Sequence, residues 1–188
     1  MLPLKNILVK DYFVLGILLI ISFLIKGFHI GETDLGQDEC FSIFAAQLTP
    51  KEIISWLTSG DNPPLWELIL HYWTQFFGIS EYAVRFPSLL FNTFTIIPIY
   101  YLGKAIANKQ VGIISALFFI FSSMALFMAH EARVYSLLAF LTTSSICLFI
   151  LLIKQPRNTS YLILLTMVNG LLLYSHYLSY WVIFVQLL

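Results

Sequence analysis

The sequence predicts an all-α, polytopic helical membrane protein, and three observations lead to this fold class. Hydrophobic residues make up 59% of the chain and charged residues only 11%, whereas soluble domains carry roughly 25% charged residues. The apolar residues also form long uninterrupted blocks, which is typical of helices that face lipid. Finally, the basic residues that flank these blocks can all be placed on one side of a bilayer.

The first apolar block, residues 11–30, follows a short basic leader that contains Lys5 and Lys10. This arrangement is similar to a signal peptide. However, the apolar core is long and no small-x-small cleavage site follows it, so we expect an uncleaved membrane anchor.

Four further spans are expected after this anchor, with the start of another. Three blocks each approach the roughly 20 residues that cross a bilayer. The last block is too long for one crossing and divides near Ser175 and His176, which gives about five to six spans in total. Residues 1–188 are therefore expected to be the N-terminal part of a larger membrane module. The later spans are predicted near residues 86–103, 111–129, 134–153, 161–177 and, incomplete, 179–188.

The segment Leu65–Phe77 is apolar but short, and it carries Glu67, His71 and Gln75. Its apolar residues recur at i, i+3, i+4, i+7, i+8 and i+11, which predicts a helix lying in the membrane interface. If this helix does not cross, six basic residues share one side, which must be the cytoplasm. The N-terminus is then cytoplasmic. These residues are Lys5, Lys10, Lys104, Lys109, Lys154 and Arg157.

A long extracytoplasmic loop, residues 31–85, follows from this topology. Besides the interfacial helix, it is expected to hold a helix from Cys40 to Gln47. Another helix is opened by the capping box of Thr49 and Glu52, with proline at its first position. A loop that contains its own amphipathic helices is usually functional.

Nine of the ten acidic residues fall on this outer face, and only Lys26, Lys51, Arg85 and Arg133 balance them. Lys26 is expected to snorkel from the end of the first span. Arg85 and Arg133 stand where spans meet the outer face, so each is a candidate for binding a phosphate at headgroup depth. The structural alternatives are an ion pair of Arg85 with Glu81 and an interfacial anchor at Arg133.

Asp38 and Glu39 form an acidic pair just before the first outer helix. They can favour the helix dipole, or one of them can act as a general base or bind a metal. Glu131 lies between two apolar blocks, where an ionised side chain is costly and often functional. Its alternative is a tight loop at the water boundary. His71 and His176 are weaker candidates, because a single interfacial histidine is usually a polar anchor.

Five short motifs occur in an order that resembles the GT-C glycosyltransferases, in particular the protein O-mannosyltransferase-like and lipid A aminoarabinose transferase-like group. The group often has histidine or lysine before the double proline, where this chain has Asn62. The motifs are Gln37-Asp38-Glu39, Asn62-Pro63-Pro64-Leu65-Trp66, Val84-Arg85-Phe86-Pro87-Ser88, His130-Glu131-Ala132-Arg133-Val134-Tyr135 and Tyr174-Ser175-His176-Tyr177.

This resemblance implies a membrane enzyme that moves a sugar from a polyprenyl-phosphate donor to a lipid, glycan or protein acceptor outside the cytoplasm. The transfer would be an inverting hexosyl or pentosyl transfer, with no nucleic acid involved. It further implies catalytic roles for Asp38, Glu39 and Glu131, and phosphate binding by Arg85 and Arg133. His71, His176 and Tyr135 are further candidates for substrate binding. A divalent metal held by Asp38 and Glu131 stays open, because two carboxylates facing one pocket could bind one.

A transporter or flippase component for a lipid-linked or anionic substrate is the alternative from another class. It would use Arg85, Arg133 and Glu131 as a binding path. It does not account for the helical outer loop, nor for charges gathered at one face instead of mid-membrane.

Overall fold

The computed structural model describes the backbone of residues 4–59 and 62–188 and the side chains of residues 11–58 and 62–188. Within these ranges all regular structure is helical, as predicted. The helices are α1 (Leu4–Gly27), α2 (Gln37–Ala46), α3 (Pro50–Ser59), α4 (Leu65–Phe77), α5 (Glu81–Phe94), α6 (Ile96–Ile106), α7 (Lys109–Ile120), α8 (Ser123–Ala129), α9 (Tyr135–Lys154), α10 (Thr159–Leu173) and α11 (Ser179–Leu187).

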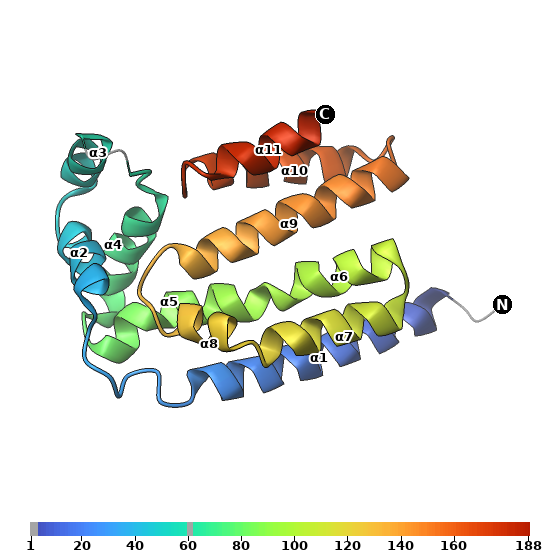
Figure 1. Cartoon of the computed structure of the whole chain (residues 1–188), viewed down its shortest axis with the longest axis horizontal. Coiled ribbons are helices and arrows are strands. Elements are labelled where there is room, and N and C mark those ends of the chain that lie inside the picture. Colours follow the sequence, from blue (N-terminus) through green and yellow to red (C-terminus); the bar gives the residue numbers. More distant parts are fainter. Residues whose placement is uncertain (1–3, 60–61) are drawn as a thin grey trace.

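The longer helices run side by side along the long axis of the molecule, and α2, α3 and α4 gather at one end of this bundle (Figure 1). The turn between α8 and α9 and the turn between α10 and α11 lie at the same end (Figure 1). The start of α1, the α6–α7 turn and the α9–α10 turn lie at the other end (Figure 1). The predicted basic clusters therefore share one end of the bundle. The side of the membrane on which that end lies stays a prediction.

The helices of the outer loop agree with the sequence patterns. Helix α4 has the predicted bounds, and the Thr49–Glu52 capping box opens α3, since Thr49 N donates to Glu52 Oε2 (2.9 Å). Helix α2 begins at Gln37, three residues earlier than predicted. The reason is that the Glu39 carboxylate accepts a hydrogen bond from Gly36 N (2.9 Å) and so stabilises an earlier first turn.

Helix α4 turns its polar side chains inward. Glu67 and His71 are buried against α2, where they contact Ser42 Oγ and the Ala46 carbonyl, and Trp66 is buried against α9 and α10. Of the apolar stripe, Tyr72 and Phe76 are exposed, and exposed apolar side chains such as these suit a helix in the membrane interface. The buried polar groups are tolerated because α2 supplies hydrogen-bond partners for them.

Two helices in the described part of the chain are long and apolar enough to cross a membrane, by length and composition: the continuous α5–α6 rod of 26 residues and α9 of 20 residues. Helices α7 and α8 pass this test together but are bent by 62°. The bend follows the capping of α8 by Ser122, whose Oγ accepts from Ala125 N (3.3 Å). The structure thus supports two to three spans. The predicted count of five to six is not confirmed, and crossings by α1, α10 and α11 stay predictions.

Lys26 does not snorkel, so that expectation is wrong. Its side chain is fully buried and donates from Nζ to Asn92 Oδ1 (2.7 Å), with Nζ 4.1 Å from the centre of the Phe119 ring. Asn92 in turn donates to Ser136 Oγ (3.2 Å). Because α1 packs against α5 and α7, the lysine is enclosed by neighbouring helices and finds its polar partner within the bundle.

Candidate active site

The turn between α8 and α9, residues 130–134, organises the candidate site. Ala132 is clamped through both of its backbone groups: its N–H donates to Glu39 Oε1 (2.8 Å), and its carbonyl accepts from the buried Trp66 Nε1 (3.2 Å). Two flanking residues, Glu131 and Arg133, line different pockets on either side of this clamp. The turn therefore separates an acidic group from a basic one within three residues.

Arg85 has all its donors engaged within the protein. Its Nε and Nη2 form a bidentate ion pair with Glu39 at 2.9 and 2.7 Å, and both residues are buried. Nη1 donates to the Ile30 carbonyl (3.0 Å) and to the carbonyl (2.9 Å) and Oγ1 (3.0 Å) of Thr33. Nη2 also reaches the Asp34 carbonyl (3.1 Å). Since a guanidinium has five N–H donors, none remains for a phosphate. Its partner is Glu39, not the Glu81 suggested by helix spacing.

Glu39 is equally saturated, since it also accepts from Ala132 N and Gly36 N. Burial alone would raise the pKa of its carboxyl, but the hydrogen bonds from Arg85, Ala132 and Gly36 outweigh burial and hold this pKa below its usual value. An ionised carboxylate that accepts four hydrogen bonds is a poor base. The geometry thus favours a positioning role for Glu39 and Arg85 over the catalytic and phosphate-binding roles expected from the sequence.

Asp38 differs from its neighbour. Its side chain is exposed in the first turn of α2 and makes no hydrogen bond or ion pair with the described residues. Its backbone carbonyl accepts a hydrogen bond from Arg133 Nη1 (3.2 Å). The structure therefore leaves the carboxylate open in a residue whose backbone is hydrogen-bonded to Arg133.

Glu131 lines a pocket of about 400 Å³ together with Asp34, His130 and the Glu39–Arg85 pair. Burial raises the pKa of the Glu131 carboxyl, and the charges of Glu39 and Asp38 add to this, although Arg85 and Arg133 oppose it. His130 is fixed by a contact of its Nε2 with the Lys26 carbonyl (2.7 Å). Apart from the saturated Arg85, no lysine or arginine lines this pocket.

Arg133 faces a smaller pocket of about 70 Å³ on the other side of the turn. One of its amino groups, Nη1, binds Ser42 Oγ (3.1 Å) and the Asp38 carbonyl, while its Nε is buried and has no partner among the described residues. This guanidinium keeps donors that an anion could use. The side chains lining the pocket include Glu67, Arg133, Tyr135 and His176.

His176 and Tyr135 thus join Arg133, although no sequence pattern linked them. The Nδ1 atom of His176 accepts from Leu178 N (3.1 Å), so its proton, when the ring is neutral, resides on Nε2. Burial lowers the pKa of His176. A neutral His176 therefore has one N–H with no partner in the described chain, in the wall of the same pocket as Arg133.

Glu67 is a site residue that sequence reasoning missed. It is buried, accepts from Ser42 Oγ (3.1 Å) and so joins the hydrogen-bond chain of Arg133. Burial raises its pKa, which the Ser42 hydrogen bond and the Arg133 charge only partly offset. The signal was a carboxylate within a largely apolar 13-residue helix.

His71 does not reach either pocket. Its Nδ1 contacts the Ala46 carbonyl (2.8 Å) and its Nε2 contacts Gln75 Nε2 (2.8 Å). Both ring nitrogens are occupied, so the geometry favours a structural link between α4 and α2. Among the described residues, no group of three or more His, Cys, Asp or Glu is placed to hold a metal ion. A metal bound by Asp38 and Glu131 stays a hypothesis.

The fold and the site define an integral membrane protein that gathers open ionisable groups at one end of an apolar helix bundle. The family model described as dolichyl-phosphate-mannose-protein mannosyltransferase matches residues 61–188, about two thirds of the chain. The chain therefore belongs to this family and is a membrane glycosyltransferase of the GT-C type. The matched segment contains Arg85, Glu131, Arg133 and His176, whereas Asp38 precedes it. No curated protein and no solved structure matches the chain. The family match gives the transporter alternative no support.

Proposed function

We propose that the protein transfers a sugar from a polyprenyl-phosphate donor to an acceptor on the extracytoplasmic face, with Asp38 as the base and Arg133 as the phosphate-binding residue. One observation carries this proposal. The open Asp38 carboxylate and the incompletely paired Arg133 guanidinium belong to residues joined by a 3.2 Å hydrogen bond from Arg133 Nη1 to the Asp38 carbonyl. A base and a cation at one point are what sugar transfer from a lipid phosphate requires.

In this mechanism the acceptor hydroxyl loses its proton to the Asp38 carboxylate while its oxygen attacks the anomeric carbon of the sugar. The bond between that carbon and the phosphate oxygen breaks, and its electron pair stays on the polyprenyl phosphate. Arg133 stabilises the charge that develops there, and the Nε2–H of His176 adds a neutral donor. Attack opposite the leaving phosphate inverts the anomeric configuration.

In this proposal Glu131 does not take part in the chemical step, unlike the catalytic role expected of it from the sequence. Its pocket has negative charge and no open cation, which disfavours a phosphate and suits the polar part of an uncharged acceptor. Glu39 and Arg85 act through the turn that they hold, because they fix Ala132 between Glu131 and Arg133. They are positioning residues.

A transfer assay tests this function. The full-length protein in membranes would be given a radiolabelled polyprenyl-phosphate mannose, comparing wild type with Asp38→Asn, Arg133→Ala and, as a matched outer-loop control, the exposed Glu52→Gln. We expect Asp38→Asn to lower kcat about 10²- to 10⁴-fold and Arg133→Ala about 10²- to 10³-fold, with the control near wild type. Full activity of Asp38→Asn would refute the base assignment. Absence of transfer from any polyprenyl-phosphate sugar by wild type would refute the function.

A further inference from the structure

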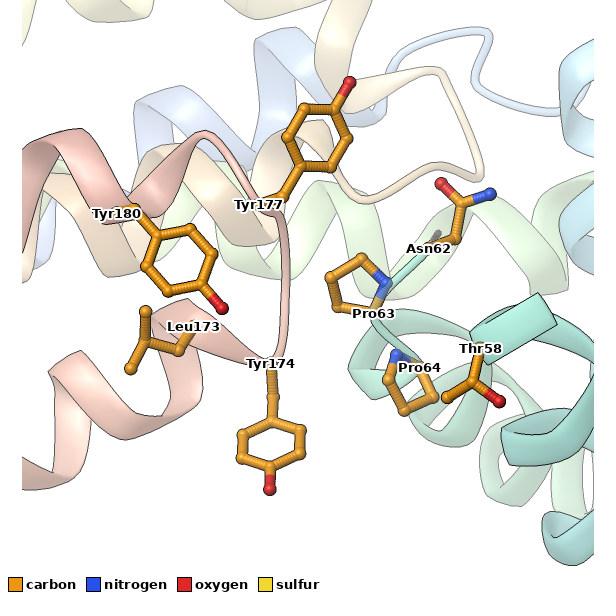
Figure 2. Close-up of a pocket in the computed structure, with 8 residues that line it drawn as sticks. All are labelled: Thr58, Asn62, Pro63, Pro64, Leu173, Tyr174, Tyr177 and Tyr180. Carbon is orange, nitrogen blue, oxygen red and sulfur yellow. The ribbon is translucent and has the colours of Figure 1, made fainter. Parts of the chain in front are cut away.

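A groove of about 840 Å³ opens between Thr58 and residues 62–64 on one side and the region of the α10–α11 turn on the other. Figure 2 shows Thr58, Asn62 and Pro63 on one side of it and Tyr174, Tyr177 and Tyr180 on the other. The groove lies at the end of the bundle that carries the candidate site. It contains none of the residues assigned to catalysis above.

The two walls are fixed to each other. Leu65 N, at the start of α4, donates to the Tyr174 carbonyl (3.1 Å) and so links the two sides. Within the turn, Ser175 is buried and its Oγ donates to the Leu172 carbonyl (2.7 Å). The tyrosines therefore project from a braced turn, and a ligand would meet a groove that is already formed.

The groove adjoins the Arg133 pocket. Asn62 and Pro63 line both spaces, and His176 of the pocket stands between Tyr174 and Tyr177 of the groove. A molecule with its phosphate at Arg133 would therefore have its adjoining part at the mouth of the groove. An acceptor approaching the same phosphate could lie there as well.

The lining of the groove is amphipathic. Tyr174, Tyr177 and Tyr180 are 65%, 53% and 63% exposed, and Thr58 lies opposite them with a hydroxyl that donates to the Ile54 carbonyl (2.7 Å) and keeps its oxygen as an acceptor. A sugar ring presents an apolar C–H face and a rim of hydroxyls, which tyrosine matches with its ring and its hydroxyl group. An isoprenoid chain offers no hydroxyls to such a lining.

A second groove in the bundle has the chemistry that an isoprenoid chain requires. It measures about 330 Å³ and is lined almost wholly by apolar side chains, among them Phe94, Phe140 and Leu148 from α5 and α9. The contrast between the two linings argues that the tyrosine groove holds the saccharide part of a substrate and not its lipid part.

We propose that the tyrosine groove binds a hexose-type saccharide next to the phosphate pocket. This inference rests on the proposed function for the identity of that pocket, but the groove can be tested without catalysis. The competing explanation is an aromatic belt, in which the tyrosines anchor the protein at the lipid headgroups and bind no sugar.

Saturation-transfer NMR on the full-length protein in nanodiscs provides the binding test, with methyl α-mannoside as probe. We expect transfer to the probe with wild type and with Asp38→Asn, and at least a several-fold loss in Tyr177→Leu/Tyr180→Leu. Tyr177→Phe/Tyr180→Phe should retain part of the signal, because the ring faces persist. Tyr72→Leu is the matched control, since Tyr72 is 55% exposed on α4 but lies outside the groove.

Three outcomes would overturn the inference: no transfer to the probe with wild type, equal transfer with the double leucine variant, or loss of probe binding on addition of farnesol. The last would identify an isoprenoid occupant. If the probe binds through the tyrosines but wild type transfers no sugar from any polyprenyl phosphate, the groove stands and the proposed function fails. In an active enzyme, a raised KM for donor or for acceptor in Tyr177→Leu/Tyr180→Leu identifies which substrate carries the bound sugar.

Discussion

Asp38 and Glu39 are adjacent, yet their surroundings give them opposite properties. Glu39 is 1% exposed and accepts four hydrogen bonds, whereas the Asp38 side chain is exposed and accepts none from the described residues. In a helix, neighbouring residues point about 100° apart, so one can enter the core while the other faces solvent. Glu39 is therefore a positioning residue, and Asp38 is the candidate base.

Removing the charge of Glu39 should destabilise the protein, whereas removing that of Asp38 should not. Glu39→Gln leaves the buried Arg85 without its counter-ion, and we expect a loss of roughly 3–5 kcal/mol in unfolding free energy. Asp38→Asn should stay within about 0.5 kcal/mol of wild type. Thermal unfolding in detergent measures both. Equal stability of the two variants would contradict the positioning role of Glu39.

The same ion pair predicts acid sensitivity. The pKa of Glu39 is lowered in the folded protein from its usual 4.5, so its stabilisation is present above that value and is lost as the pH falls through the lowered pKa. Wild type should therefore lose stability below about pH 4.5, while Glu39→Gln should lack this part of the acid dependence. Parallel pH titrations of Tm, with Glu81→Gln at an exposed position of α5 as the control, would reveal it.

Glu67 predicts the opposite pH trend. Its pKa is raised, mainly by burial, so the stability associated with its protonated form is present at low pH and is lost as the pH rises through the raised pKa. Glu67→Gln keeps an oxygen for Ser42 and removes the charge. We expect its Tm advantage over wild type to grow as the pH rises above the usual glutamate pKa of 4.5. A constant difference above that pH would show that the pKa of Glu67 is not raised in the folded protein.

At the scale of elements, two close contacts between helices and turns determine how the bundle is packed. The α8–α9 turn is clamped between α2 and α4 through Ala132. At the other end of the bundle, α6 and α7 meet through Gly103 and Gly112, where a Cβ on Gly112 would lie 2.5 Å from the Tyr100 carbonyl oxygen. Glycine permits this close contact between helix backbones, as at small-residue interfaces in membranes. Asp11 secures the same corner by pairing with Lys104 and Lys109.

Gly112→Ala should accordingly open the α6–α7 contact, because the new methyl group meets backbone atoms that cannot rotate away. We expect a loss of about 1–3 kcal/mol. Gly170→Ala in α10 is the matched control, since its Cβ would have no neighbour within 4 Å, and it should gain about 0.5–1 kcal/mol from helix propensity. Unfolding in detergent compares the two, and equal effects would contradict the close packing of α6 on α7.

At the scale of the whole molecule, the two ends of the helix bundle differ in the charge of their side chains. One end holds Lys104, Lys109 and Lys154 around short turns, and the other holds the acidic outer loop and both pockets (Figure 1). The positive-inside rule assigns the first end to the cytoplasm. Lipid-linked substrates would then meet the site at the opposite headgroup layer.

Cysteine accessibility tests this orientation. In a Cys40→Ser background, which removes the exposed native thiol, Gln75→Cys on α4 should react with a membrane-impermeant maleimide added outside intact cells. Gln110→Cys on α7 should react only after permeabilisation. Both side chains are exposed, so burial would not explain a difference. Reaction of Gln110→Cys in intact cells would invert the proposed topology.

By itself, the sequence determined the helical membrane class, the bounds of α4 and the capping box of α3, because these depend on composition and on contacts within one or two turns. It also identified most of the ionisable residues of the site, through a resemblance carried by short motifs. It did not foresee the bend between α7 and α8 or the inward polar face of α4.

Only the tertiary structure decided which charged groups are saturated and which remain open. Glu39 meets Arg85 across 46 positions and Ala132 across 93, and Glu67 joins Arg133 only through Ser42. No local pattern encodes such pairings. A charge that is removed from water must find its partners wherever the packed helices bring them, so the function of each acid and arginine depends on the whole bundle.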